Sequence, residues 1–267
     1  MSYLHSKAQN SDASGCIQKI TPESANWDYV GFEVYTLKAG ESFEQKSEDQ
    51  EACVVLISGF ADVKTDNESW KNIGQRMSVF DREAPYAIYT PPCDSLTLTA
   101  NTDVEIAVCK APAEGKFPTR LITPEQCSYE TRGQGTNERH ICNILFGNLP
   151  AEKLLVVEVI TPNGNWSSYP PHKHDTQNPP NETHLEETYY HKLNPPQGFA
   201  FQRVYTDDRS IDETISVENN SVVMVPEGYH PVGAPHGYDL YYLNVMAGPT
   251  REWIFKNDPA HEWMVKI

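Results

Sequence analysis

Short runs of β-branched and aromatic residues, separated by turn-forming residues, recur along the whole chain. They include YVGFEVYTL, ACVVLISGFADV and VEIAVCKAP in the first half, and KLLVVEVITP, GFAFQRVYT and DLYYLNVMAG in the second. Runs of this kind between Gly, Pro, Asn and Asp are typical of β-strands. No segment of a dozen residues shows a clean helical repeat, and 20 prolines with 15 glycines disfavour long helices. We therefore predict an all-β protein with few short helices.

A polar, irregular stretch separates two series of such runs. It covers most of residues 112–140 and reads PAEGKFPTRLITPEQCSYETRGQGTNER, the composition of a linker. In each half an acidic residue, Glu51 or Glu187, opens a strong strand, and a later strand closes on a proline turn. A chain of 267 residues is long enough for two domains. We predict two tandem small β-barrels, over residues 1–137 and 138–267.

The chain is strongly acidic. It has 37 Asp and Glu against 21 Lys and Arg, which gives a net charge of −16. Such a protein repels phosphate backbones and anionic lipid, so we expect neither nucleic acid nor a membrane as a partner. An anionic substrate would need local arginines or a metal ion to attract it.

Cysteine usage and the N-terminus indicate the compartment. Six cysteines lie far apart without a CxxC pair, and several sit inside apolar strand-like runs. This pattern favours free thiols in a reducing cytosol over disulfides. The N-terminus MSYLHSKAQNSDASG lacks the apolar core of a signal peptide, and no apolar run reaches about 18 residues. We expect a cytoplasmic protein.

Three histidines and a glutamate occur in an order that suits one metal ion. His172 and His174 are two residues apart, so a strand would project both to the same face. Glu187 opens the run ETYYHKL, and His230 follows a Pro-x-Gly turn. This order resembles the metal signature of cupins, in which His, His, Glu and His meet on one ion. Three imidazoles and a carboxylate leave coordination positions open for a substrate.

The spacing departs from that signature in two places. Glu187 lies thirteen residues after His174, where four or five are usual, so the residues between them predict an inserted loop. One residue rather than two separates Gly228 from His230. Plain loop histidines and a structural metal stay open as other interpretations.

The first half offers no comparable set of ligands. Its corresponding segments, KAGESFEQKSEDQEACVVLISG and YTPPCDSLT, contain no histidine. We therefore expect the N-terminal barrel to be a scaffold and the C-terminal barrel to carry the metal and the active site.

Longer strings of the sequence point to a family. They are TPESANWDYVGFEVYTLKAGES, RMSVFDREAPYAIYTPP, APAEGKFPTRLI, NWSSYPPHKHD, LEETYY, GFAFQRVYTDDRSIDET and VPEGYHPVGAPHGYDLYYLNVMAGPTREW. In this order, over nearly the whole chain, the sequence resembles the 5-deoxy-glucuronate isomerases of myo-inositol catabolism. The resemblance implies a bicupin, with two tandem barrels of the jelly-roll type.

The same resemblance implies the ligands and the reaction. The related 5-keto-4-deoxyuronate isomerases bind zinc through His, His, Glu and His, which fall here on His172, His174, Glu187 and His230. Zinc is therefore preferred, and Mn, Fe, Co or Ni would suit the same ligands. The implied reaction is the aldose–ketose isomerisation of 5-deoxy-D-glucuronate to 2-deoxy-5-keto-D-gluconate. No nucleotide-binding motif is present, so no nucleotide cofactor is expected.

Such an isomerisation moves a hydrogen between adjacent carbons, most simply through an enediol. A metal would stabilise the enediolate charge, and a base would carry the proton. The candidate bases and proton donors are Glu182, His184, Glu186, His191, Tyr190 and Tyr241. If Glu186 were the ligand, it would exchange roles with Glu187. A hydride shift, which needs no base, stays open.

The substrate's carboxylate needs a cation in this acidic protein. Arg203 and Arg251 are the first choices, with Lys173 and Arg139 behind them, because a forked guanidinium matches a carboxylate. A salt bridge to a neighbouring aspartate, Asp207 or Asp208, is the competing role of Arg203. The aromatic residues expected to wall the pocket, or else to fill the core, are Tyr169, Phe199, Tyr229 and Tyr242.

Two other functions are open from sequence. The first is a cupin oxygenase that uses iron, and the second is a non-catalytic sugar-binding barrel. The expected partner is a small sugar acid, and a homo-oligomer is left open. Isomerisation without oxygen would separate the isomerase from an oxygenase.

Overall fold

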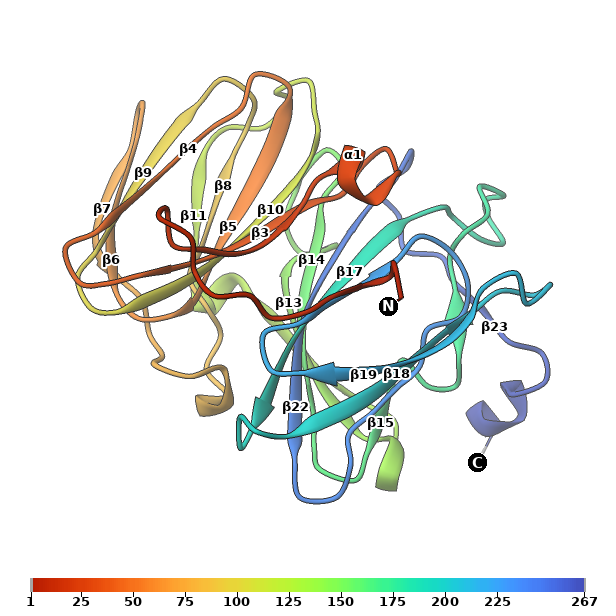
Figure 1. Ribbon diagram of the computed structural model, residues 1–267. Coiled ribbons are helices and arrows are strands. Elements are labelled where there is room, and N and C mark those ends of the chain that lie inside the picture. Colours follow the sequence, from red (N-terminus) through yellow and green to blue (C-terminus); the bar gives the residue numbers. More distant parts are fainter. Residues whose placement is uncertain (1, 267) are drawn as a thin grey trace. The chain divides into compact units, whose positions relative to one another are not determined.

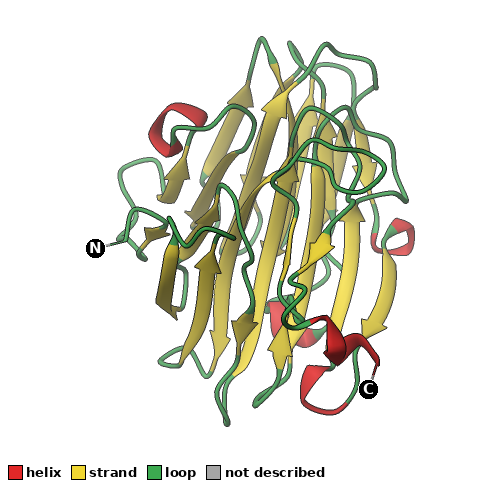
Figure 2. Cartoon of the chain, turned by 90° about the vertical axis from the view of Figure 1, so that its right-hand side faces the viewer, coloured by secondary structure: helices red, strands yellow, loops and turns green. Residues whose placement is uncertain are grey.

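The computed structural model describes residues 2–266, with the backbone alone for Lys266 (Figure 1). Strands and the loops between them make up nearly all of this range, and its helices are short (Figure 2). These are α1 (Pro22–Ala25) and the 3-10 helices η1 (Val79–Asp81), η2 (Pro124–Gln126), η3 (Gly135–Asn137) and η4 (Glu262–Lys266). None of them is long and apolar enough to cross a membrane. The predicted all-β class is confirmed.

The chain forms two compact units. The N-terminal unit comprises residues 9–128 and 142–157, and the C-terminal unit comprises the residues up to Ala8, Tyr129–Ile141 and those from Glu158 onward. They do not follow a single cut between residues 137 and 138. One reason is that β1 (His5–Ser6) pairs with β20 (Val222–Val225), so the N-terminus belongs with the second half. In addition, β13 (Arg139–Leu145) and β14 (Leu155–Thr161) contribute residues to both units.

The N-terminal unit contains two antiparallel sheets. The six-stranded sheet consists, in spatial order, of β11 (Arg120–Ile122), β8 (Ala87–Thr90), β5 (Gln50–Ser58), β10 (Val104–Pro112), β3 (Gly31–Leu37) and β2 (Cys16–Ile20). The four-stranded sheet consists of β4 (Ser42–Lys46), β9 (Ser95–Ala100), β6 (Ala61–Thr65) and β7 (Ser69–Ile73).

Apolar residues from both sheets share one core. Residues of β4 and β9 alternate between buried and more exposed, so Phe43, Leu96 and Leu98 point inward. Val54 and Ile106 join them from the six-stranded sheet. This alternation is typical of antiparallel sheets that have one face on the core and one in water.

Strands of the C-terminal unit belong to three sheets. The seven-stranded sheet has the order β1-β20-β17-β22-β14-β13-β12, and includes β17 (Glu186–Asn194), β22 (Asp239–Ala247) and β12 (Ser128–Arg132). The four-stranded sheet consists of β15 (Trp166–Ser167), β21 (Val232–Gly233), β18 (Phe199–Tyr205) and β19 (Asp212–Glu218). A small pair is formed by β16 (His172–Lys173) and β23 (Lys256–Asn257).

Both units use the same order of strand pairing. The series β8-β5-β10-β3 corresponds to β20-β17-β22-β14, and β4-β9-β6-β7 corresponds to β15-β21-β18-β19. Glu51 and Glu187 take the same position, the second residue of β5 and of β17. The topology agrees with the expected duplication of a small β-barrel.

Candidate metal centre

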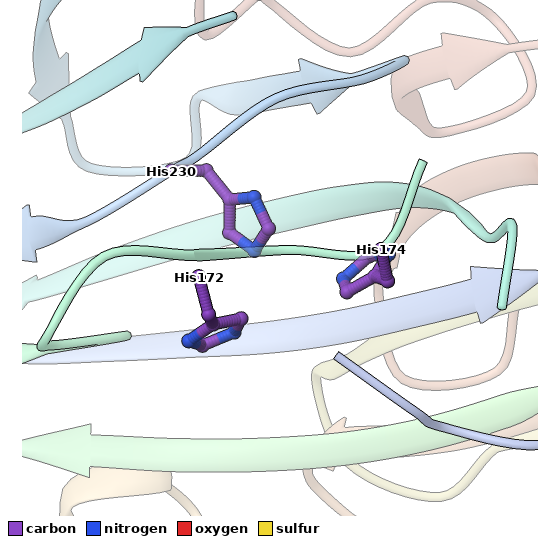
Figure 3. A group of neighbouring side chains, drawn as sticks. All are labelled: His172, His174 and His230. Carbon is purple, nitrogen blue, oxygen red and sulfur yellow. The ribbon is translucent and has the colours of Figure 1, made fainter. Parts of the chain in front are cut away.

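Three histidines of the C-terminal unit face one another (Figure 3). His172 belongs to β16 and His174 follows that strand, whereas His230 lies between β20 and β21. One ligand nitrogen of each ring lies within 4.8 Å of the other two. Among residues 2–266, this is the only group of three or more His, Cys, Asp or Glu side chains that is close enough to share a metal ion.

Glu187 adds a carboxylate to this group. Its Oε2 lies 3.0 Å from His174 Nε2 and 3.1 Å from His230 Nε2, while Asn244 donates a hydrogen bond to its Oε1. The three facing atoms are buried, and none makes a hydrogen bond of acceptable geometry. Buried polar atoms without a partner are costly and therefore rare. A cation between them would satisfy all three.

Backbone carbonyls hold the far nitrogens of two rings. His174 Nδ1 lies 3.1 Å from Leu185 O, and His230 Nδ1 lies 2.8 Å from Gly228 O. A carbonyl only accepts, so each Nδ1 carries the proton, and the Nε2 of the neutral ring presents a lone pair. Metal-binding histidines commonly have this bond on the far nitrogen. The donor set fits a divalent ion.

The charges at this centre shift one another's protonation. Burial, aided by the other rings, lowers the pKa of His172 well below its usual value, and burial also lowers the pKa of His230. Burial opposes ionisation of Glu187, yet His230 and His174 outweigh it and lower the carboxyl pKa to about 2. Burial likewise opposes protonation of His174, but Glu187 raises its pKa overall. The ionised carboxylate and the neutral rings of His172 and His230 are in the state that metal ligands require, whereas His174 would give up its proton when a metal binds.

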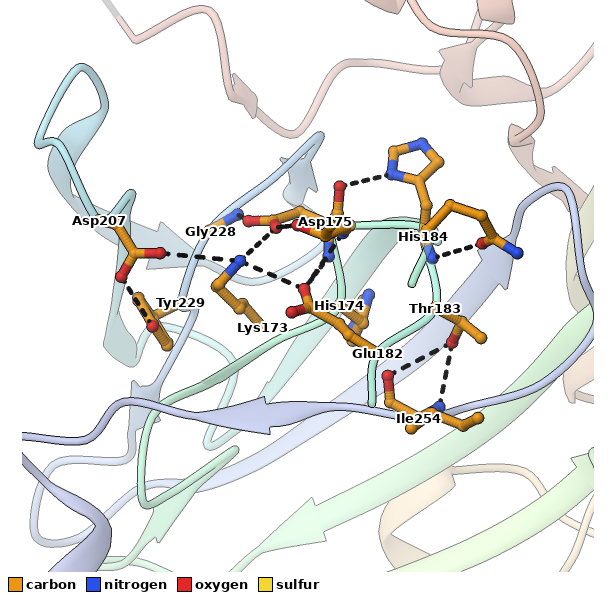
Figure 4. A network of polar contacts seen from close by, with 12 residues as sticks. Lys173, His174, Asp175, Glu182, Thr183, His184, Asp207, Gly228, Tyr229 and Ile254 are labelled. Carbon is orange, nitrogen blue, oxygen red and sulfur yellow. Dashed lines mark hydrogen bonds and ion pairs between the residues drawn. The ribbon is translucent and has the colours of Figure 1, made fainter. Parts of the chain in front are cut away.

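Polar contacts fix the conformation of the loop between His174 and Glu187 (Figure 4). Glu182 Oε1 accepts hydrogen bonds from the backbone N–H groups of Asp175, at 2.9 Å, and Thr176, at 3.1 Å. It also lies 3.2 Å from Lys173 Nζ, which in turn lies 2.5 Å from Asp175 Oδ1. The inserted loop is therefore held by buried ion pairs. These contacts give Lys173 and Glu182 a structural role, and the substrate-binding and catalytic roles expected of them stay predictions.

Two further candidate bases, one in the loop and one at the start of β17, are turned away from the histidines. His184 Nδ1 lies 3.1 Å from the backbone O of Asp175, and its backbone N–H donates to Gln177 Oε1 at 3.0 Å. Glu186 is buried at the start of β17, where strand alternation points it to the face opposite Glu187.

The expected tyrosines, Tyr190 and Tyr241, also lie on the opposite face. The hydroxyl of Tyr190 donates to Asn220 Oδ1 at 3.0 Å, and that of Tyr241 donates to Glu158 Oε2 at 3.0 Å. Strand alternation explains this placement, because Tyr190 is three residues from Glu187 and therefore points the other way.

Tyr189 and Tyr242, by contrast, approach the metal centre. The ring centroid of Tyr189 lies 5.8 Å from that of His230 and 4.8 Å from that of Tyr242. Their hydroxyls meet Ser168 Oγ at 3.0 Å and Ser167 Oγ at 2.6 Å, respectively. Burial raises the pKa of both tyrosines, so both hydroxyls keep their protons. The i, i+2 spacing from Glu187 is the sequence signal that would have identified Tyr189.

His191 lies further along the same face of β17. Its Nε2 lies 3.0 Å from Gln202 Oε1, and the ring is fully buried. Burial lowers the pKa of His191 to about 3, so the ring is neutral. Its role is consistent with packing and hydrogen bonding inside the barrel.

A pocket of about 720 Å³ opens beside His172. The aromatic residues Trp253 and Phe255 form part of its wall, with ring centroids 5.9 and 4.9 Å from that of His172. Arg132 and Arg139 also line it. No Asp or Glu of the described chain is among the lining residues.

The first-choice arginines lie elsewhere. Arg203 forms two hydrogen bonds with Asp212, Nε to Oδ1 at 2.8 Å and Nη2 to Oδ2 at 2.9 Å. Its neighbour Gln202 is buried, so Arg203 points to the outer face of β18. The competing role, a salt bridge, is therefore the observed one, with Asp212 rather than Asp207 or Asp208 as the partner. Arg251 is half-buried and does not line the pocket.

The aromatic candidates divide between pocket and core. Tyr169 lines the pocket, and Tyr242 packs against Tyr189. Phe199 is 40% exposed, and the hydroxyl of Tyr229 donates to Asp207 Oδ1 at 2.9 Å.

Glu51, which corresponds to Glu187, anchors a loop in the N-terminal unit. Its carboxylate accepts hydrogen bonds from the backbone N–H groups of Glu152 at 2.9 Å, Lys153 at 2.7 Å and Leu154 at 2.8 Å. The hydroxyl of Tyr89 donates to it at 2.6 Å. The Glu51 carboxylate is thus saturated with hydrogen bonds from the protein, whereas Glu187 Oε2 faces two imidazoles and makes no hydrogen bond of acceptable geometry.

Comparisons with known proteins agree with this picture. The model of the KduI/IolB family matches residues 3–264. A relative from Geobacillus thermodenitrificans (strain NG80-2), named 5-deoxy-glucuronate isomerase, is 56% identical over 266 residues, which cover 100% of this chain and 97% of the relative. The crystal structure of an IolB-like protein from Salmonella typhimurium LT2 is 52% identical with a TM-score of 0.95, covering 98% of this chain and 99% of that one.

A more distant likeness identifies the fold. The oxalate decarboxylase of Lactobacillus farciminis superimposes with a TM-score of 0.66 at 14% identity, covering 100% of this chain and 91% of that one. At this identity the likeness concerns the fold alone. Together with the duplicated strand order, it makes the structure a bicupin of the jelly-roll type, as the sequence predicted.

Proposed function

The chain belongs to the KduI/IolB family and is an isomerase, and from this premise we propose that it converts 5-deoxy-D-glucuronate to 2-deoxy-5-keto-D-gluconate in myo-inositol degradation. The relative from Geobacillus thermodenitrificans, which carries the name of this activity, matches the chain from end to end. None of the six cysteines, all of which lie within the described residues, forms a disulfide, which supports a reducing cytoplasm as the location.

The observation that carries the proposal is the set of three buried, unsatisfied atoms that face one another. They are His174 Nε2, His230 Nε2 and Glu187 Oε2, and the ring of His172 lies beside them. We propose that these four residues hold one divalent transition metal, with zinc preferred. When bound, the ion would polarise the carbonyl and hydroxyl oxygens of the substrate.

The pocket supports a particular route for the hydrogen. No carboxylate of the described chain lines it, and the histidine that does, His172, is assigned to the metal, so no lining carboxylate or imidazole is left to act as the base. We therefore favour a hydride shift, in which hydrogen passes from the hydroxyl-bearing carbon to the neighbouring carbonyl carbon. The hydroxyl proton then passes to the former carbonyl oxygen, so the mass is unchanged. The protonated hydroxyl of Tyr189 is the group that we assign to hold or move this proton.

The two units would have different roles. We propose that the C-terminal unit carries the active site and that the N-terminal unit is a scaffold. The different partners of Glu51 and Glu187 support this division.

The test is an anaerobic reaction of the purified, metal-loaded protein with 5-deoxy-D-glucuronate. A ketose of unchanged mass is expected, and a strict need for oxygen would contradict the isomerase. In deuterium oxide, a hydride shift leaves the transferred position free of deuterium. Deuterium at that carbon would instead show that a base exchanges the proton with solvent.

A further inference from the structure

We propose that Arg139 binds the carboxylate of the substrate and thereby sets which end of the molecule meets the metal centre. This inference rests on the proposed function, because it takes the substrate to be an aldehyde at one end and a carboxylate at the other. It assigns the specificity for an acid over a neutral sugar to one side chain.

The guanidinium of Arg139 is held in place by hydrogen bonds from one of its three nitrogens. Arg139 opens β13 and lines the same pocket as His172. Its Nη1 donates to the backbone O of Asn137 at 3.1 Å and lies 3.4 Å from Asn137 Oδ1. Within residues 2–266, Nε and Nη2 make no hydrogen bond. That edge of the guanidinium is the one that binds a carboxylate with two parallel hydrogen bonds.

Gly133, in the loop that precedes Arg139, allows the guanidinium and the carbonyl of Asn137 to pack closely against the backbone. Gly133 has φ +76°, a conformation that favours glycine, and a Cβ there would lie 2.0 Å from Asn137 O and 2.9 Å from Arg139 Nη1. A side chain at position 133 would therefore displace the carbonyl that orients the guanidinium.

The charge of Arg139 is influenced by Glu130, but the two side chains do not form an ion pair. No acidic side chain of the described chain forms an ion pair with it, and the residue is half-buried. Burial lowers its pKa, although a guanidinium keeps its proton in proteins. A partly buried charge without an ion-pair partner is unfavourable, so an anion in the pocket would be stabilised there. Elsewhere the net charge of −16 repels anions.

Arg132, the other arginine of the pocket, already has partners. Its Nη2 lies 2.6 Å from Glu130 Oε1, and its guanidinium lies over the ring of Trp253, 5.0 Å from the centroid. Trp253 also contacts His172 edge-on. Arg132 therefore adds positive potential to the wall, while Arg139 has the unoccupied donors.

The experiment compares two substrates on two variants. 5-Deoxy-D-glucose carries a hydroxymethyl group where 5-deoxy-D-glucuronate has its carboxylate, so the ratio of kcat/KM for the two sugars isolates the carboxylate contact. Arg139→Gln should lower kcat/KM for the acid by roughly 30-fold or more, mainly through KM, and leave that for the neutral sugar nearly unchanged. Arg139→Lys should recover part of the preference. Arg209→Gln removes the same charge from an exposed arginine and is the matched control.

The following results keep this inference separate from the proposed function. If the wild-type protein does not isomerise the acid, the proposed function fails. If the wild type is active and Arg139→Gln keeps its preference for the acid, or Arg203→Gln loses it, the assignment to Arg139 is overturned. Binding of the unreactive acid whose aldehyde has been reduced to an alcohol, measured by calorimetry, should weaken by a similar factor in Arg139→Gln. Equal binding in both proteins would overturn the assignment without reference to turnover, and equal metal content would exclude damage to the metal centre.

Discussion

Replacing Glu51 by glutamine should destabilise the protein without impairing its chemistry. Oε1 of Glu51 accepts the N–H groups of Lys153 and Leu154, and Oε2 accepts that of Glu152 together with the hydroxyl of Tyr89. Glutamine can keep one oxygen in place, but its amide NH₂ then replaces the other. The N–H that used this oxygen would meet a donor instead of an acceptor.

The size of the effect follows from these four bonds. Leaving one buried donor without an acceptor costs about 1–3 kcal/mol, and the bonds that remain lose the strength that a charged acceptor gives them. We expect the free energy of unfolding to fall by about 3–4 kcal/mol. With a dependence on urea of about 2–3 kcal/mol per molar, the midpoint should shift by about 1–2 M.

The assay is urea unfolding followed by tryptophan fluorescence, with kcat measured on the folded protein. Glu44→Gln makes the same chemical change on an exposed position of β4 and should alter stability by less than about 0.5 kcal/mol. Equal stability of the two variants would refute the anchoring role of Glu51. A large fall in kcat per folded molecule would refute the scaffold role of the N-terminal unit.

Other predictions concern the C-terminal unit. Tyr189→Phe should lower kcat by roughly 10- to 100-fold, whereas Tyr190→Phe, which changes a hydroxyl on the opposite face, should not; equal rates would remove Tyr189 from the chemistry. Glu182→Gln should lower the free energy of unfolding by about 2–3 kcal/mol, because it leaves a buried lysine short of a partner, and thermal unfolding that matches wild type would contradict this. Glu187 raises the pKa of His174, so a proton competes with the metal for this ring at pH values already above 6.5. Metal retention in dialysis should therefore fall as the pH decreases. Retention that does not depend on pH would exclude the ion pair between His174 and Glu187.

Features set by local backbone geometry could be predicted from the sequence. Strand runs and their turns gave the all-β class, and the i, i+2 rule brought His172 and His174 to one centre. Applied consistently, the same rule would also have selected Tyr189 over Tyr190, since Tyr189 shares the face of Glu187. The sequence therefore contained that information.

Features set by pairing between distant residues could not be predicted. The guanidinium of Arg203 is paired with Asp212, and this contact depends on the register of β18 against β19. Arg139 is left with free donors by the path of the preceding loop, which no pattern of residue types reveals. The N-terminal residues likewise belong to the C-terminal unit because β1 pairs with β20. Charge complementarity in a sequence names candidates, and only the fold decides which of them are already paired.

Metal stoichiometry tests the central claim most directly. The protein, purified in the presence of zinc and dialysed, should retain about one equivalent per chain by elemental analysis, and His174→Ala should retain almost none and lose turnover. His236→Ala, which removes an exposed histidine, should match wild type in metal content. Full retention of the metal by His174→Ala would contradict the assignment of the four ligands.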